Sequence, residues 1–337
     1  MPSEIRSVLY YNCIQSLLRM KVYLINCTSR SEFYLSVLSL PDSLQPVLFS
    51  WVLSLFLLTV LGNVTITALV YTTPGLHTPM YYFLCNLAVE DVLYVCTTLP
   101  KFLAMTISLD TRIMLPGCLA QMFVFLSCAV AEFLLLGSMA YDRYVAICVP
   151  LRYTSIMNRN MCIGLSCVPW IVGLVNALMN VVLVLTLSFC HSHNINQFFC
   201  DLKTIISLST DDTTRVQMLV LLQSVFLGLV PFVTILISYT CIISSIIRIH
   251  SSARRLKAFS SCSSHLTIVI LFCGVSISSY MIPQSLHSQE QDKVLSLIYT
   301  ALVPMFNPLV YSFRNKQVLG AIDTVVKRYS KGRCRQK

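Results

Sequence analysis

The sequence predicts an all-α integral membrane protein, a seven-transmembrane helix bundle followed by a short amphipathic eighth helix. Of its 337 residues, 56% are hydrophobic and only 11% are charged, and the mean hydropathy is +0.73. A soluble domain carries about 25% charged residues, so this chain lacks the charge needed to cover a surface in water. Several apolar stretches reach the roughly 20 residues that a helix needs to cross a bilayer.

The seven expected spans follow one another along the chain. They cover residues 46–71, 79–104, 117–147, 160–185, 215–249, 259–283 and 293–312. The first contains a charge-free run from Val47 to Val70, which is about 36 Å of helix. The fifth is longer than a bilayer requires, so its end is expected to project beyond the membrane.

An amphipathic stretch follows the last span. Its apolar face is formed by Val318, Leu319, Ile322, Val325 and Val326. This pattern is typical of a helix that lies in the membrane interface. The chain therefore divides into an N-terminal segment (1–45), the seven-helix domain (46–312) and the amphipathic helix with its tail (313–337).

Basic residues predict the orientation. If the N-terminus lies outside, the inner side holds fifteen of the 24 Lys and Arg residues, as the positive-inside rule requires. The N-terminus is thus expected outside and the C-terminus in the cytoplasm. The sequon Asn26-Cys27-Thr28 then lies outside, just before the first span, and predicts glycosylation of Asn26.

Carboxylates inside the spans are the most informative polar residues, because each is costly in a bilayer unless it is paired or hydrated. Asp91 lies about 18 Å and Glu132 about 15 Å from the inner ends of their helices. Asn63 and Asn307 fall about 10–12 Å above the same face. The four side chains are therefore expected in one layer of the bundle. Glu90 points about 100° away from Asp91 and is a secondary candidate.

Two carboxylates in one dry layer require a cation or a shared proton. One interpretation is a sodium site at Asp91 and Glu132, and the other is that protonated acids and amides merely join the helices. Apart from this ion, no cofactor is expected.

Two further motifs suggest a mechanical switch. Asp142 and Arg143, at the inner end of the third span, can form a local ion pair whose arginine is free to change partners. Asn307-Pro308 lies in the seventh span, where a proline frees a carbonyl and kinks the helix. Pro304, four residues earlier, weakens the same helix.

Four strings, in order along the chain, resemble the signatures of vertebrate odorant (olfactory) receptors of the class II branch, which are rhodopsin-like G-protein-coupled receptors. They are LHTPMYYFL (76–84), MAYDRYVAIC (139–148), KAFSSCSSHL (257–266) and PMFNPLVYSFRNK (304–316). The resemblance covers about residues 26–325. It implies a receptor of the plasma membrane that binds a small odorant and activates a stimulatory, olfactory-type G protein to raise cyclic AMP. The expected partners are thus the odorant, this G protein and membrane lipid, but not nucleic acid.

The resemblance also assigns roles to individual residues. Cys118 matches the family cysteine that bridges to the second outer loop, and Cys200 matches its partner. The switch and G-protein coupling fall to Asp142, Arg143, Tyr144, Asn307, Pro308 and Tyr311. The basic run Arg248, Arg254, Arg255 and Lys257 is either a G-protein contact or only a consequence of topology.

By position in these motifs, ligand contacts come from the outer halves of the third, fifth and sixth spans, with one from the seventh. They are Met122, Phe125, Leu126, Ala129, Val130, Gln223, Ser224, Leu227, Ser276, Ile277, Tyr280 and Thr300. This set is mostly apolar with a few hydrogen-bonding groups, which suits a small, neutral, partly apolar volatile. Each of these side chains could instead serve only in helix packing.

The chain departs from the family pattern at two places. Thr210 stands where a second loop cysteine, the partner of Cys190, is expected, and Cys273 replaces a common tyrosine. A transporter or channel is the main rival class, but no inverted repeat or continuous polar file supports it. An enzyme is disfavoured because the chain has no HExxH, no Gly-x-Ser-x-Gly and no phosphate-binding glycine loop.

Overall fold

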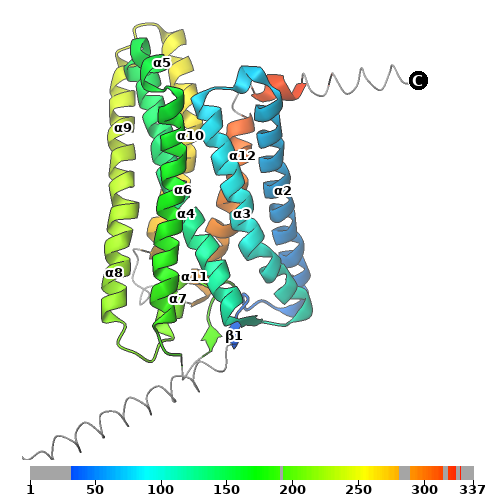
Figure 1. Ribbon diagram of the computed structural model, residues 1–337. Coiled ribbons are helices and arrows are strands. Elements are labelled where there is room, and N and C mark those ends of the chain that lie inside the picture. Colours follow the sequence, from blue (N-terminus) through cyan, green and yellow to red (C-terminus); the bar gives the residue numbers. More distant parts are fainter. Residues whose placement is uncertain (1–31, 190–192, 281–288, 314–317, 324–326, 328–337) are drawn as a thin grey trace, which may run out of the picture.

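The computed structural model describes residues 32–189, 193–280, 289–313, 318–323 and 327. Within these ranges, the side chains of residues 254, 257, 261, 264, 275–280 and 311–313 lie outside the description. Long helices lie side by side and form one elongated bundle (Figure 1).

The bundle is built from α2 (Gln45–Thr72), α3 (Pro79–Ser108), α4 (Leu115–Cys148), α6 (Arg159–Leu185), α8 (Thr214–Ser224) with η4 (Val225–Leu229) and α9 (Val230–Ile247), α10 (Ser252–Tyr280), and α11 (Gln289–Leu297) with η6 (Ile298–Leu302) and α12 (Val303–Phe313). Of the described helices, six segments are long and apolar enough to cross a membrane, and α10 contains a shorter apolar run, His265–Gly274. This arrangement agrees with the predicted seven-helix bundle.

Shorter elements connect the spans. They are η1 (Asp42–Leu44), η2 (Pro74–Leu76), η3 (Pro150–Arg152), α5 (Tyr153–Ile156) and α7 (Leu202–Ser207). The helix α10 begins seven residues before the expected span, which started at 259, because its first two turns are helical but too polar to be counted as membrane-crossing. Residues 318–323 are helical. Of the predicted apolar face, Val318 and Ile322 pack on the bundle and Leu319 is exposed, while Val325 and Val326 lie outside the described residues.

Two spans contain a π-helical turn, and each turn is followed by a proline. The Val230 N–H bonds to the Val225 carbonyl and the Val303 N–H to the Ile298 carbonyl, five residues back in each case. Pro231 and Pro304 follow two residues after these π segments. A proline clashes with the carbonyl four residues before it, and the wider turn gives that carbonyl room.

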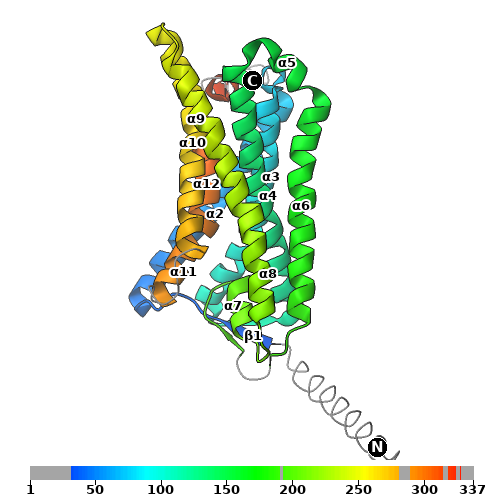
Figure 2. The same ribbon diagram turned by 90° about the vertical axis from the view of Figure 1, so that its left-hand side faces the viewer.

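One end of the bundle, called here the sheet end, carries a small sheet of order β2-β1-β3 (Figure 2). The central strand β1 (Glu32–Leu35) pairs antiparallel with β2 (Arg112–Met114) and parallel with β3 (Asn194–Ile195). Three segments that are distant in sequence therefore meet at this end. The opposite end, where α4 and α9 terminate and α10 begins, is called the arginine end.

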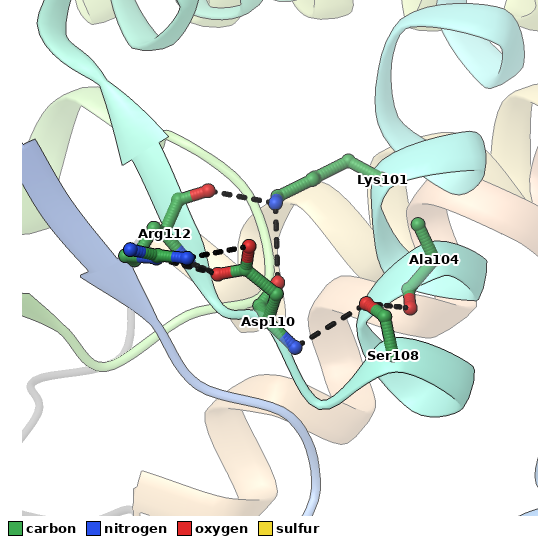
Figure 3. Close-up of polar contacts among 5 residues, drawn as sticks. All are labelled: Lys101, Ala104, Ser108, Asp110 and Arg112. Carbon is green, nitrogen blue, oxygen red and sulfur yellow. Dashed lines mark hydrogen bonds and ion pairs between the residues drawn. The ribbon is translucent and has the colours of Figure 1, made fainter.

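The turn between α3 and β2 is fixed by side chains (Figure 3). Lys101 Nζ donates to the carbonyl oxygens of Asp110 and Arg112, at 3.3 Å and 2.7 Å. The Arg112 guanidinium pairs with the Asp110 carboxylate at 3.0 Å. Hydrogen bonds from Arg112 lower the pKa of Asp110 to about 2, so this ion pair persists at any physiological pH.

Candidate functional site

A disulfide joins Cys118 at the start of α4 to Cys200, which precedes α7. The pairing inferred from the family resemblance is therefore confirmed. Gln121, one turn further along α4, reinforces this connection. Its amide donates to the Thr97 carbonyl at 2.9 Å and accepts from the Cys200 backbone N–H at 2.8 Å. Gln121 thus links α3, α4 and the loop before α7, a role that no sequence motif indicated.

Phe125 lies at the centre of a buried aromatic cluster beneath this loop. Its ring centroid is 5.0 Å from that of Tyr94, 4.9 Å from Phe199 and 5.9 Å from Tyr299. Phe198 extends the cluster by contacting Phe199 at 5.1 Å. Phe199, the residue before Cys200, therefore packs directly on Phe125, one of the ligand candidates of the third span.

The other third-span candidates differ in burial. Met122 is fully buried, and Leu126, Ala129 and Val130 are partly buried. Met122, Phe125, Leu126 and Ala129 thus pack in the apolar core of the bundle, which is consistent with either of the two roles open for them.

Gln223 of the fifth span lies in a polar pair with α6. The Asn180 side-chain N–H donates to Gln223 Oε1 at 3.0 Å and to the Asn176 carbonyl at 2.8 Å. Within the described part of the chain, Gln223 Nε2 and Asn180 Oδ1 are buried and have no hydrogen-bond partner. One open donor and one open acceptor therefore flank the same contact, and Asn176 and Asn180 are candidates that the motif-based prediction missed.

The remaining ligand candidates are placed less uniformly. Ser224 is exposed, and its hydroxyl donates to the Val220 carbonyl of its own helix at 2.8 Å. Leu227 is partly buried within η4, and Thr300 is fully buried within η6. Leu227 and Thr300 lie four residues before Pro231 and Pro304, so their carbonyls are the ones for which the π turns make room. Each π turn therefore contains one ligand candidate. Three candidates have side chains outside the described residues: Ser276, Ile277 and Tyr280.

A layer of buried polar side chains crosses the middle of the bundle. The Asn307 amide N–H group donates to both oxygens of Asp91, at 2.9 Å and 3.0 Å, and lies 3.5 Å from Glu132 Oε1. Asn63 is buried on α2, where a Cβ on the preceding Gly62 would lie 3.1 Å from Pro308. Asn63 also forms a side-chain hydrogen bond with Asp91, so the structure brings all four expected side chains together.

Glu90 is as deeply buried as Asp91. Both of its carboxylate oxygens lack a hydrogen-bond partner among the described residues. A buried carboxyl group without a partner is stable only when it holds a proton or a cation. Glu90 is thus a buried acid of the bundle interior like Asp91 and Glu132, although the sequence marked it only as a secondary candidate.

The layer has the oxygen donors that a hard cation prefers. Asn307 Oδ1 is buried and has no hydrogen-bond partner in the described residues, so the amide whose N–H group contacts Asp91 also carries an oxygen that is open to a cation. Nowhere in the described ranges do three or more His, Cys, Asp or Glu side chains form a group that could hold a metal ion. An ion here would therefore rest on Asp91, Glu132 and amide oxygen.

At the arginine end, Asp142 and Arg143 form the expected ion pair. The Arg143 Nη2 atom lies 3.4 Å from Asp142 Oδ2. Tyr153 of α5 donates its hydroxyl proton to Asp142 Oδ1 at 2.8 Å. Burial, together with the Asp142 carboxylate, raises the pKa of Tyr153, so this phenol remains a donor. Tyr144 is partly buried, with its ring stacked on Tyr141.

A second contact at this end joins the fifth and sixth spans. Tyr239 Oη and His265 Nδ1 lie 2.5 Å apart, both side chains are buried, and their rings are stacked. His265 belongs to the KAFSSCSSHL string, but nothing in the sequence indicated that Tyr239 would be its partner.

Comparison with known proteins agrees with this geometry. A family model described as "Olfactory receptor" matches residues 52–329. Human "Olfactory receptor 2T11" is 41% identical over 298 residues, which cover 88% of this chain and 94% of that protein. The chain belongs to the olfactory receptor family. Human "Olfactory receptor 2A12" is 42% identical, covering 89% of this chain and 97% of its own, and gorilla "Olfactory receptor 1G1" is 41% identical, covering 89% and 96%.

This olfactory receptor is therefore an odorant-sensing, G-protein-coupled protein of the membrane and not an enzyme. Its departures from the family pattern have visible structural counterparts. Thr210, which replaces a cysteine, donates through both its backbone N–H and its hydroxyl to the Ser188 carbonyl, at 3.0 Å and 3.1 Å. The Ser188 N–H in turn donates to Asp211 Oδ2 at 2.7 Å. Hydrogen bonds thus hold the receptor's loop close to where the second bridge would be.

The other departure, Cys273, is buried within the apolar cluster around the sixth span of the receptor. Pro308 is buried inside α12 as expected. The side chain of Tyr311 lies outside the described residues, as do Asn26 and Cys190.

Proposed function

We propose that this receptor binds small, neutral, partly apolar volatiles such as alcohols, ketones or esters within the bundle. Binding activates a stimulatory, olfactory-type G protein and raises cyclic AMP. The receptor acts in the plasma membrane, with the N-terminus and sheet end outside and the arginine end in the cytoplasm. The basic residues of the arginine end support this orientation.

The single observation that carries the ligand class is the chemistry around α4 and η4. An aromatic cluster centred on Phe125 supplies apolar contact area, and the Asn180–Gln223 pair supplies an open donor and an open acceptor. Small-molecule sites are typically apolar with a few placed polar groups. No Lys, Arg, Asp or Glu occurs among the ligand candidates, which disfavours an ionic odorant.

The arginine end supplies the switch. A bound odorant favours a state in which the inner end of α10 moves outward, and it can do so only by its greater affinity for that state. This motion separates Tyr239 from His265, since they belong to different spans, and Arg143 leaves Asp142. The opened cleft then receives the G protein.

The test is odorant-driven cyclic AMP in cells that express this receptor with an olfactory-type G protein, screened against a panel of small volatiles. We expect a dose-dependent rise, which Arg143→Ala abolishes at equal surface expression. A full response in Arg143→Ala would contradict the coupling mechanism.

Two matched variants of the same span then test the ligand site. Gln223→Met removes the open donor while keeping the side-chain length, and it should raise the effective concentration of hydroxyl-bearing odorants roughly tenfold, the effect of about one lost hydrogen bond. Ser224→Ala serves as the control, because this hydroxyl is exposed and bonded to its own helix. Equal effects of both variants would move the ligand site away from α8.

We further propose that Asp91, Glu132 and Asn307 bind Na⁺ in the resting receptor. The open Asn307 oxygen supports this assignment over packing alone. Replacing Na⁺ by choline in the assay should raise basal cyclic AMP in the unmodified receptor but not in Asp91→Asn. An identical response of both receptors to the exchange would favour protonated acids that only join the helices.

A further inference from the structure

A groove of about 520 Å³ separates the ends of α9 and α10 at the arginine end. Its walls are formed by five apolar side chains together with one serine and one arginine. The lining residues are Ile243, Ile246, Ile247, Ser252, Arg255, Leu256 and Phe259. Its size falls within the range of about 300–1,000 Å³ that is common for small-molecule sites.

The groove faces outward. Ile246, which forms its back wall, is only 5% exposed and belongs to the apolar core of this end. Ile247, Leu256 and Phe259 are 67%, 70% and 54% exposed. Exposed apolar side chains of this size need an apolar partner, and in a membrane protein that partner is a lipid chain.

The one charged residue of the groove lining, Arg255, is positive. Arg255 is exposed and forms no ion pair within the described residues. The chain contains no Asp or Glu between Asp212 and Glu290. The other described acids of this end are already engaged, since Asp142 pairs with Arg143 and Asp323 with Lys327.

We propose that this groove binds an anionic phospholipid of the inner leaflet. An acyl chain lies along Ile243, Ile247 and Phe259, and the headgroup phosphate accepts hydrogen bonds from Arg255 and Ser252. Basic pockets between spans on the cytoplasmic side recognise anionic headgroups in this way. The proposal rests on the proposed orientation, which places the arginine end in the cytoplasm.

Such a lipid would sit between the two helix ends whose separation opens the receptor. It would therefore regulate coupling without touching the odorant site.

Native mass spectrometry of the full receptor, released from nanodiscs of mixed phosphatidylcholine and phosphatidylserine, tests the proposal without requiring an odorant response. We expect retained phosphatidylserine to be enriched over its share of the disc. Arg255→Gln should reduce this enrichment roughly fivefold, the effect of one arginine near a membrane surface. Leu256→Ser, which keeps the charge, should also reduce it because the acyl chain loses apolar contact.

Arg159→Gln is the matched control, since Arg159 is exposed at the same end and lies outside the groove. Equal losses in Arg159→Gln and Arg255→Gln would overturn the proposal in favour of general surface charge. No enrichment in the unmodified receptor would also overturn it. A third result would overturn the proposal and assign the groove to a protein partner. In this case the G protein would bind the receptor in pure phosphatidylcholine, Arg255→Gln would weaken that binding, and added phosphatidylserine would not compete with it.

Discussion

The two ends of this receptor are held together by different kinds of bond. The sheet end has a disulfide between Cys118 and Cys200 and backbone pairing among three distant segments. The arginine end, in the part the structure describes, depends on side-chain contacts such as Tyr153–Asp142 and Tyr239–His265, and a groove separates α9 from α10. The first end is thus fixed, and the second can be rearranged by breaking a few hydrogen bonds.

The seventh span strengthens this contrast. Lys293, which is almost fully buried, donates to the Val37 carbonyl at 3.2 Å and to Glu290 Oε1 at 3.0 Å. Glu290 also accepts from the Ser39 N–H and hydroxyl, both at 3.1 Å. The segment after β1 therefore ties the start of the seventh span to the sheet end, so that a change of shape is directed toward the opposite end.

The largest expected effect comes from removing the disulfide at the sheet end. Cys118→Ser or Cys200→Ser removes a link that is worth about 2–5 kcal/mol in small secreted domains. We expect surface expression to fall to near background and thermal stability of the purified receptor to drop. Cys167→Ser is the control, since this thiol is exposed and free. Normal expression of both bridge variants would show that the sheet alone holds this end.

A smaller effect is expected from removing one hydrogen bond at the arginine end. Tyr153→Phe removes the hydrogen bond that orients Asp142, and Arg143 then leaves more readily. Because a bond to a charged group contributes about 1.5–3 kcal/mol, and about 1.4 kcal/mol is a factor of ten, basal cyclic AMP should rise by at least roughly tenfold, with little change in thermal stability. Tyr71→Phe, at an exposed position of the same end, should have no effect. A loss of stability without any rise in basal signal would show that the two ends do not differ as described.

The smallest effect is expected at the α3–β2 turn. Arg112 lowers the pKa of Asp110 below its ordinary value of 3.8 to about 2, so the pair stabilises the fold fully above pH 3.8 and loses this effect only as the pH falls through 2. Asp110→Asn should therefore reduce the melting temperature slightly and by the same amount at about pH 5 and about pH 8. A reduction that differs between these two pH values would point to another titrating group.

The sequence predicted the bundle well because membrane burial is encoded in composition. Long apolar runs defined the spans, and helix rise alone placed Asp91, Glu132 and Asn307 at one depth. Depth does not determine which helices are neighbours, however. The Asn180–Gln223 and Tyr239–His265 pairs depend on which faces of distant spans meet, and no local spacing encodes that information.

The small sheet was not predicted from the sequence either. Its strands β1, β2 and β3 have two to four residues each, too few to show the alternation that identifies a strand. Their pairing arises only because the disulfide and the helix ends bring the three segments together. The link between this loop and α4 was thus predicted through the two cysteines and not through the strands.

The π turns have a consequence for how this receptor can evolve. Each takes up one residue more than an unbroken α-helix would use, so the helical segments on its two sides keep the facing that they would have without that residue. Deleting a single codon between Val225 and Leu229 would therefore leave Gln223 facing Asn180, but the carbonyl four residues before Pro231 would lose the room that the π turn provides. Single-codon deletions in this stretch are thus expected to survive selection only together with loss of the proline.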